Sequence, residues 1–371
     1  MDPSDVTIPR SLLPADGRFG CGPTKIRPEA VARLVAVGRT LLGTSHRREP
    51  VREQVGRLQS GLRELFGLPS DYEVLLANGG ATTFWDMAAF GLVRDRSAHY
   101  VFGEFSAKFA AATRSAPWID EPVVVEAEPG TRPDPRQIDG VDVQALTHNE
   151  TSTGVMMEVV RPDDALVVVD ATSAATGLPV DPTAFDVYYF SLQKGLASEG
   201  GIVVALLSPR AIERIGELAP SAERYVPTSL DLSVALDNSR QRQTYNTPAI
   251  ATLFLAAEQV DWINGKGGLA WATSSCRDKA EHVYAWAEHR AWAAPFVADP
   301  AARSHVVTTV DLDGVAADDV NAVLRRHGVV DTESYRKLGR NQLRIGLFPA
   351  VDLADVQAYT ACVDHVVEQL T

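Results

Sequence analysis

Residues 166–207 read LVVVDATSAATGLPVDPTAFDVYYFSLQKGLASEGGIVVALL, and this segment decides the fold class. It holds three short runs of mostly aliphatic and aromatic residues, and a polar or glycine-rich turn follows each of the first two. Runs that are apolar on both sides are typical of strands buried on both faces of a parallel sheet. The segment therefore predicts three strands of an α/β protein, with polar residues where strands end.

The same alternation extends toward the N-terminus. Apolar side chains of residues 51–66 fall on one helical face, and Gly67 is expected to end that helix. Seven strands with helices between them predict an α/β fold built on one large, mostly parallel sheet. The four earlier strand-like runs are residues 74–76, 99–102, 123–125 and 143–147.

The pattern changes after residue 262. A glycine-rich break at residues 264–268 is followed by a long helical stretch and by two strand-like runs, with helical patterns between and after them. We therefore expect two domains. Residues 15–263 would form the large α/β domain and residues 264–371 a smaller α+β domain, with the long helix able to belong to either. The two runs are residues 306–310 and 343–347, and the helical patterns are residues 317–327 and 353–370.

The totals argue against several classes of partner. The 371 residues carry 35 Lys and Arg against 48 Asp and Glu, a net charge of −13, which disfavours nucleic acid or an anionic membrane. No apolar run approaches the ~18 residues of a membrane-spanning helix, and the first residues lack the apolar core of a signal peptide. Cys21, Cys276 and Cys362 show no metal-ligand spacing, so we expect no bound metal; three cysteines cannot all pair, which fits a reducing compartment. We expect a soluble, cytoplasmic protein.

Three expected strands deliver polar groups to one edge of the sheet. Asp170 follows the first run of the quoted segment and Lys194 follows the second, while Gly-Gly-Ala-Thr at residues 79–82 joins a strand to a helix. Ligands of open α/β sheets bind at the carboxyl ends of the strands. Each group also has an ordinary explanation: Asp170 as a helix N-cap, Lys194 as a solvated loop residue and the glycines as a tight turn.

Together these groups match the needs of pyridoxal 5'-phosphate. This cofactor requires a lysine for its aldehyde, a carboxylate for its pyridine nitrogen and a helix N-terminus for its phosphate. At ~4 Å and an effective dielectric of ~20, the carboxylate and the ring nitrogen attract by about 4 kcal/mol. That energy is roughly three pKa units, enough to keep the nitrogen protonated near neutral pH. Lys194 would hold the cofactor as a Schiff base and, once displaced by the amino substrate, move the proton between Cα and C4′.

Five short motifs follow one another along the chain: Asn78-Gly-Gly, His148-Asn-Glu-Thr151, Asp170-Ala-Thr-Ser173, Gln193-Lys194 and Tyr245-Asn-Thr-Pro248. In this order they resemble the phosphoserine aminotransferase family, a class V, fold-type-I group of pyridoxal-phosphate enzymes. The resemblance runs from about Phe19 to Val366 and looks closest to the actinobacterial branch. It implies a large fold-type-I aminotransferase domain, a smaller C-terminal domain and a homodimer with shared active sites.

The resemblance also implies which residues bind the cofactor. Asp170 would face the pyridine nitrogen, and Thr151 would hydrogen-bond the hydroxyl side of the ring. Phe105 falls where the family stacks a tryptophan on the ring, although its place on an amphipathic helix is equally typical of a core residue. Ala81 and Thr82 stand where many members have Gly-Arg. The cofactor phosphate would be held by Gln193, by the backbone at Ala81 and Thr82, and by Asn246 and Thr247 from the second subunit.

Cationic residues are the candidates for substrate binding. Arg344 matches the family's arginine for the substrate α-carboxylate, a bidentate task suited to a planar guanidinium. His46 and Arg47 match the pair that meets the substrate phosphate across the dimer interface; without the family, they are more typical of a solvated charged turn. One loop before Arg344 adds three cations that could close over the substrate: Arg336, Lys337 and Arg340.

The expected reaction transfers an amino group from L-glutamate to 3-phosphohydroxypyruvate, giving O-phospho-L-serine and 2-oxoglutarate in serine biosynthesis. Phosphohydroxythreonine of vitamin B6 biosynthesis is a possible further substrate. The alternative is another class V transaminase, such as one giving serine or alanine with glyoxylate, but a small neutral side chain needs no cationic pocket. A cysteine desulfurase would need a mobile nucleophilic cysteine, and none of the three lies in a suitable loop. A non-catalytic member of the fold would typically have lost Lys194 or Asp170, and both are present.

Overall fold

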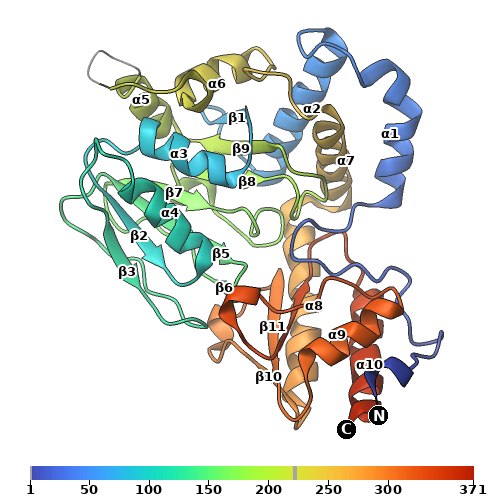
Figure 1. Cartoon of the computed structure of the whole chain (residues 1–371). Coiled ribbons are helices and arrows are strands. Elements are labelled where there is room, and N and C mark those ends of the chain that lie inside the picture. Colours follow the sequence, from blue (N-terminus) through green and yellow to red (C-terminus); the bar gives the residue numbers. More distant parts are fainter. Residues whose placement is uncertain (1, 220–223) are drawn as a thin grey trace.

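The computed structural model describes residues 2–219 and 224–371, and its centre is a seven-stranded sheet between two layers of helices (Figure 1). Six strands share one direction, and β9 alone runs antiparallel to both strands beside it, β1 and β8. The predicted large and mostly parallel sheet is therefore confirmed. In spatial order the strands are β1 (Glu73–Asn78), β9 (Ile202–Leu207), β8 (Val187–Ser191), β7 (Leu166–Asp170), β4 (Val143–Thr147), β2 (Ser97–Val101) and β3 (Val123–Glu126).

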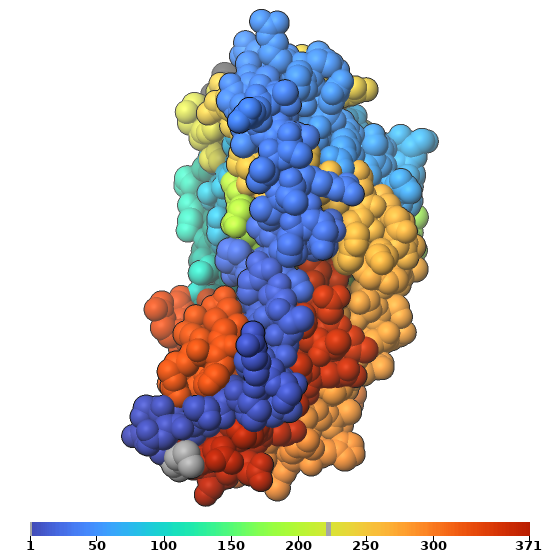
Figure 2. Space-filling model, turned by 90° about the vertical axis from the view of Figure 1, so that its right-hand side faces the viewer, coloured from blue at the N-terminus to red at the C-terminus, as the bar shows by residue number. Residues whose placement is uncertain are grey.

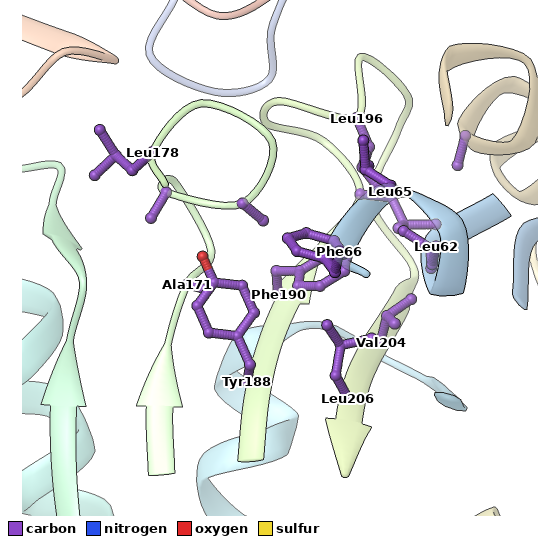
Figure 3. Close-up of a cluster of buried hydrophobic side chains, with 14 of the residues drawn as sticks. Leu62, Leu65, Phe66, Ala171, Leu178, Tyr188, Phe190, Leu196, Val204 and Leu206 are labelled. Atoms are coloured by element: carbon purple, nitrogen blue, oxygen red, sulfur yellow. The ribbon is translucent and has the colours of Figure 1, made fainter. Parts of the chain in front are cut away.

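Alternate residues of each central strand enter two separate cores. On one face, Tyr188 and Phe190 of β8 pack with Val204 of β9 against the apolar face of α2 (Glu49–Phe66), as Figure 3 shows. On the other face, Tyr189 joins a second core, beneath a second layer of helices. Because both faces are covered, the strands can be apolar throughout. The remaining helices of these layers are α1 (Pro28–Leu41) and α7 (Ile250–Lys266) on the first face, and α3 (Ala81–Gly91), α4 (Glu104–Arg114), α5 (Pro209–Glu217) and α6 (Leu232–Arg240) on the second.

Helix α2 ends where the sequence predicts. Gly67 takes a left-handed conformation, with φ of +57°, and its N–H bonds to the carbonyl of Glu64, which closes the last turn. Such a conformation costs glycine little, because it has no Cβ.

A second, three-stranded antiparallel sheet lies in the C-terminal part, in the order β10 (Ala293–Pro295), β11 (Val307–Leu312) and β12 (Gln342–Gly346). Helices α9 (Ala317–Arg326) and α10 (Leu353–Leu370) pack with it around a core of its own. The short strand β10 was not anticipated, since Ala-Ala-Pro has little strand character. Two further short strands, β5 (Asn149–Glu150) and β6 (Val155–Met156), form a hairpin.

Helix α8 (Gly268–Glu288) connects the two parts of the chain (Figure 1). Its first half buries Ala272 and Cys276 in the core of the large sheet, and its second half buries Val283 in the C-terminal core. Figure 2 shows the N-terminal segment lying along the C-terminal part, and Phe19 is buried in the C-terminal core. The domain division at residues 15–263 and 264–371 therefore stays a prediction. Within residues 2–219 and 224–371, no helix is long and apolar enough to cross a membrane.

Candidate active site

A cavity of about 420 Å³ opens at the carboxyl ends of the parallel strands. Asp170 is the last residue of β7, and Lys194 follows three residues after Ser191 at the end of β8. The turn from β1 into α3 closes another side with residues 80–82. The structure thus brings the predicted lysine, carboxylate and helix start together at one edge of the sheet.

Lys194 is half-buried against the N-terminal segment. Its Nζ donates a hydrogen bond of 2.5 Å to the carbonyl oxygen of Cys21. Burial, together with the nearby positive charge of Arg344, lowers the pKa of Lys194 to about 8. A Cβ at Gly22, whose φ is +133°, would lie 2.2 Å from this Nζ, so the close approach requires glycine.

Asp170 is 5% exposed and is held by three donors. The backbone N–H of Thr172 donates to Oδ1 over 2.9 Å. The hydroxyl of Tyr189 and the indole N–H of Trp85 donate to Oδ2 over 3.1 and 3.3 Å. Asp170 lines the cavity, and these bonds fix the plane of its carboxylate there.

The start of α3 forms the end of the cavity that suits an anion. Ala81 and Thr82 line the cavity, so the positive end of the helix dipole meets it. The backbone N–H of Ala81 donates to Oγ of Ser191 over 2.7 Å. Gln193 lines the same cavity, and its buried Oε1 has no hydrogen-bond partner among the described residues.

The opposite wall comes from the hairpin that follows β4. Oγ of Ser173 accepts hydrogen bonds from Asn149 and Thr151, over 2.9 and 2.8 Å. All three residues line the cavity, as does Phe105 in the first turn of α4. Every residue predicted to bind the cofactor within one subunit therefore lines this one cavity.

Arg344 lies on β12, next to this wall rather than among the lining residues. One of its Nη atoms donates to the carbonyl oxygen of Thr151 over 3.2 Å, and its buried Nε has no hydrogen-bond partner in residues 2–219 and 224–371. The guanidinium lies 5.3 Å from the ring centre of Tyr335, whose ring centre is 6.1 Å from that of Phe105. A line of contacts thus connects the small sheet to the cavity.

The predicted phosphate-binding pair lies elsewhere in this single chain. Nδ1 of His46 is 3.0 Å from Oγ1 of Thr247, and Arg47 and Asn246 line a second cavity of about 480 Å³. Burial, with the charge of Arg47, lowers the pKa of His46. Asn78 lines this second cavity and, at the β1–α3 turn, binds the backbone of both Asn246 and Thr247. His46, Arg47, Asn246 and Thr247 therefore lie at or beside the second cavity rather than the first, and their predicted roles across a dimer interface stay predictions.

Two of the three cations of the loop before β12 are paired at the surface. Lys337, in η5 (Arg336–Leu338), lies 2.5 Å from a carboxylate oxygen of Glu104, and Arg340 pairs with Asp311. Neither residue lines the first cavity. Lys337 is therefore held beside the site by its pair with Glu104 at the start of α4, and it does not line the first cavity.

Several residues of the site were not predicted. Trp85 and Tyr189 orient Asp170, Ser191 binds the start of α3, and the backbone of Cys21 holds Lys194. Ser191 carried a usable signal, because it ends the strand that leads to Lys194. The carbonyl of Cys21 carried no such signal, because every residue has a backbone carbonyl and the residue type does not show which one binds a lysine.

Comparison with known proteins agrees with this geometry. Residues 22–333 match the family described as aminotransferase class-V. The chain is 58% identical over 370 residues to a putative phosphoserine aminotransferase of Mycolicibacterium vanbaalenii, and the match covers 99% of both chains. It is 57% identical over 369 residues to the phosphoserine aminotransferase of a Nocardioides species, with 98% of both covered.

The fold is also similar to solved structures. A phosphoserine aminotransferase of Cytophaga hutchinsonii superposes with a TM-score of 0.86 at 25% identity, covering 96% of this chain and 100% of that one. The predicted fold type and the predicted resemblance, including its actinobacterial character, are confirmed. The chain belongs to the class-V aminotransferase family and is a pyridoxal-phosphate-dependent transaminase.

Proposed function

We propose that the chain is a phosphoserine aminotransferase. It would transfer an amino group from L-glutamate to 3-phosphohydroxypyruvate, giving O-phospho-L-serine and 2-oxoglutarate in serine biosynthesis. The observation that carries the proposal is the one cavity in which Lys194, Asp170 and the start of α3 meet. The relatives named phosphoserine aminotransferase, at 57% and 58% identity over nearly the whole chain, support the choice of substrate.

The cavity suits pyridoxal phosphate by its chemistry. Three residues line it with a buried side-chain oxygen that has no hydrogen-bond partner among the described residues: Asn149, Thr172 and Gln193. Buried polar atoms without partners are costly, so their presence together is typical of a ligand site. Lys194 would bind the cofactor, Asp170 and Thr151 would meet its ring, and Phe105 would lie against it. The phosphate would lie at the start of α3 with Gln193.

When bound, pyridoxal phosphate withdraws electrons from the substrate carbon that loses its proton. Asp170 would supply the negative charge that keeps the ring nitrogen protonated. Lys194 would act as the base that takes the proton from the substrate Cα and returns it at C4′. A pKa of about 8 suits this role, since a substantial fraction of the amine is then neutral near neutral pH.

The substrate would bind through positive charge at both ends. Arg344 would bind the α-carboxylate, because its guanidinium lies beside Thr151 and has an unpaired Nε within the described part of the chain. His46 and Arg47 would bind the phosphate or the side-chain carboxylate of glutamate, with Lys337 reaching it if its loop moves. One cationic pocket can thus serve both half-reactions.

The arrangement within one chain also supports a homodimer. His46, Arg47, Asn246 and Thr247 gather beside the exposed Tyr245, on the other side of the β1–α3 turn from the cavity of their own chain. We propose that they complete the site of a second subunit. Lys194→Ala and Arg47→Glu would then be separately inactive, but an equimolar co-refolded mixture should recover about a quarter of the full activity. A monomeric active protein in ultracentrifugation contradicts the dimer.

A half-reaction screen tests the proposed substrate. Phosphoserine, glutamate, alanine and serine are each mixed with the holoenzyme, and the absorbance of the cofactor is followed. Phosphoserine and glutamate should convert the cofactor fast, and alanine and serine slowly. Phosphohydroxythreonine belongs in the same screen as the proposed second substrate. Faster conversion by alanine or serine would point to a different class V transaminase.

A further inference from the structure

We propose that Glu150 is a positioning residue that sets the cofactor-facing groups Phe105 and Thr151 by capping helix α4 from outside that helix. The proposal rests on the proposed function, in which these two groups meet the cofactor. Glu150 itself would touch neither substrate nor cofactor. It acts through the two residues that line the cavity.

Helix α4 begins without a cap of its own. Its N-cap residue is Gly103, which has no side chain to accept a hydrogen bond. The free N–H groups of the first turn need acceptors, since buried donors without partners are costly. Glu150 and Ser152, from the hairpin after β4, supply these acceptors.

The bonds cover successive residues of the helix. Oγ of Ser152 accepts from the N–H of Glu104 over 3.0 Å. Oε2 of Glu150 accepts from the N–H of Phe105 over 3.1 Å, and from both the N–H and the hydroxyl of Ser106 over 3.0 Å. Phe105, which lines the cavity, is therefore held by its backbone directly on Glu150.

The second carboxylate oxygen holds the hairpin. Oε1 of Glu150 accepts from the N–H and the hydroxyl of Ser152, over 3.2 and 2.7 Å. Thr151 lies between these two residues in sequence, and its hydroxyl points to Ser173 in the cavity. One buried side chain therefore bonds both to the backbone of Phe105 and to Ser152, the residue after Thr151. In this way it sets the positions of Phe105 and Thr151 relative to one another.

The negative charge of Glu150 matters to this arrangement. Every group that binds its side chain is a donor, and only a carboxylate can accept at both oxygens. Burial raises the pKa of Glu150, while the bonds from Ser106 and Ser152 oppose that rise. The start of α4 is also where the helix dipole favours a negative charge.

The close packing leaves no room for adjustment. A Cβ at Gly103 would lie 2.3 Å from Cγ of Glu150 and 2.6 Å from Oγ of Ser152. Glycine at this place lets the carboxylate reach the first turn of the helix. A larger residue there would force Glu150 away from Phe105.

The test compares Glu150→Gln with Glu104→Gln in the holoenzyme. Both remove one carboxylate near the start of α4, but only the first replaces one of the two oxygens that accept from Phe105, Ser106 and Ser152 by an NH2 donor. We expect Glu150→Gln to weaken retention of added pyridoxal phosphate about tenfold. It should also change the visible circular-dichroism band of the bound cofactor, which reports the orientation of the ring. Glu104→Gln should leave both readouts within about twofold.

Two further measurements keep the outcomes separable. Ser152→Ala should move both readouts in the same direction by a smaller factor, and it decides the matter if Glu150→Gln does not fold. Cofactor affinity and circular dichroism unchanged in a folded Glu150→Gln protein, or in Ser152→Ala where the first does not fold, would overturn the inference. If the parent itself binds no cofactor on Lys194, the proposed function fails instead.

Discussion

The two ends of the candidate site are built differently. At the cofactor end, Asp170 is 5% exposed and held by three donors, and Lys194 is fixed by a backbone carbonyl. At the proposed phosphate end, Arg47 lines a separate cavity, and the side chain of Lys337 is 61% exposed and paired with Glu104. One chain therefore suffices to bring together the residues around Lys194 and Asp170, whereas the proposed phosphate pocket would need a second chain or movement of the loop around Lys337.

The largest effect is expected at the buried end, from Lys194→Ala. Loss of the amine removes both the covalent attachment of the cofactor and the base for the proton transfer, so turnover should fall below about 10⁻⁴ of the parent. Steady-state transamination of phosphoserine measures it. The exposed Lys266→Ala is the control, and it should keep parent activity. Appreciable turnover by Lys194→Ala would mean that another residue is the base for the proton transfer.

A reactivity profile checks the same lysine without a mutation. Only the neutral amine attacks an aldehyde, and burial lowers the pKa of Lys194 to about 8. At pH 7 its neutral fraction should exceed that of a lysine of pKa about 10.5 by about 300-fold. Modification of the cofactor-free protein by a simple aldehyde should rise with pH and level off above about pH 8. A rate that still climbs near pH 10 contradicts this environment for Lys194.

Asp170→Asn should have the next largest effect. The substitution keeps the size of the side chain but removes the negative charge that would face the cofactor, so the rate constant should fall by about 10²- to 10³-fold. Transient kinetics of the first half-reaction measure this directly. A loss of less than about tenfold, roughly 1.4 kcal/mol, is too small for the role.

The positions of Asp170 and Lys194 were predictable because strands of a parallel sheet end at one edge. Asp170 and Lys194 each follow an apolar run, and the sequence pattern by itself therefore puts both at that edge. The direction of β9 could also have been inferred: only ten residues separate Ser191 from Ile202, and a parallel crossover needs a dozen or more.

Other features of the site depend on contacts between distant residues. Lys194 binds a carbonyl 173 residues away, and Lys337 pairs with Glu104 across 233 residues. Such pairs leave no local pattern in a sequence. The cap that Glu150 gives to α4 belongs to the same class, since it joins residues about 45 positions apart.

Arg47→Ala at the exposed end and Arg344→Ala beside the cavity should distinguish the binding of the two parts of the substrate. Losing one charge-assisted hydrogen bond costs roughly 1.5–3 kcal/mol, or about ten- to a hundredfold in kcat/KM. Arg47→Ala should lower kcat/KM for phosphoserine far more than for alanine. Arg344→Ala should lower kcat/KM for phosphoserine, glutamate and alanine together. If Arg47→Ala lowers all three equally, the phosphate pocket lies elsewhere.

The smallest effect is expected at Lys337, whose side chain is exposed. Lys337→Ala should raise KM for phosphoserine by about fivefold or less and leave kcat unchanged. Glu104→Gln, which releases Lys337 from its partner, should lower that KM or leave it unchanged. If the two variants raise KM equally, the pair serves to hold the loop in place and Lys337 does not bind phosphate.

We propose that Lys194 carries the cofactor, and chemical reduction of the holoenzyme is the sharpest test of that role. The holoenzyme is treated with borohydride, digested and mapped by mass spectrometry. We predict one modified peptide, with the reduced cofactor on Lys194 and its absorbance retained after denaturation. Cofactor attached to another lysine, or released entirely on denaturation, would contradict the account.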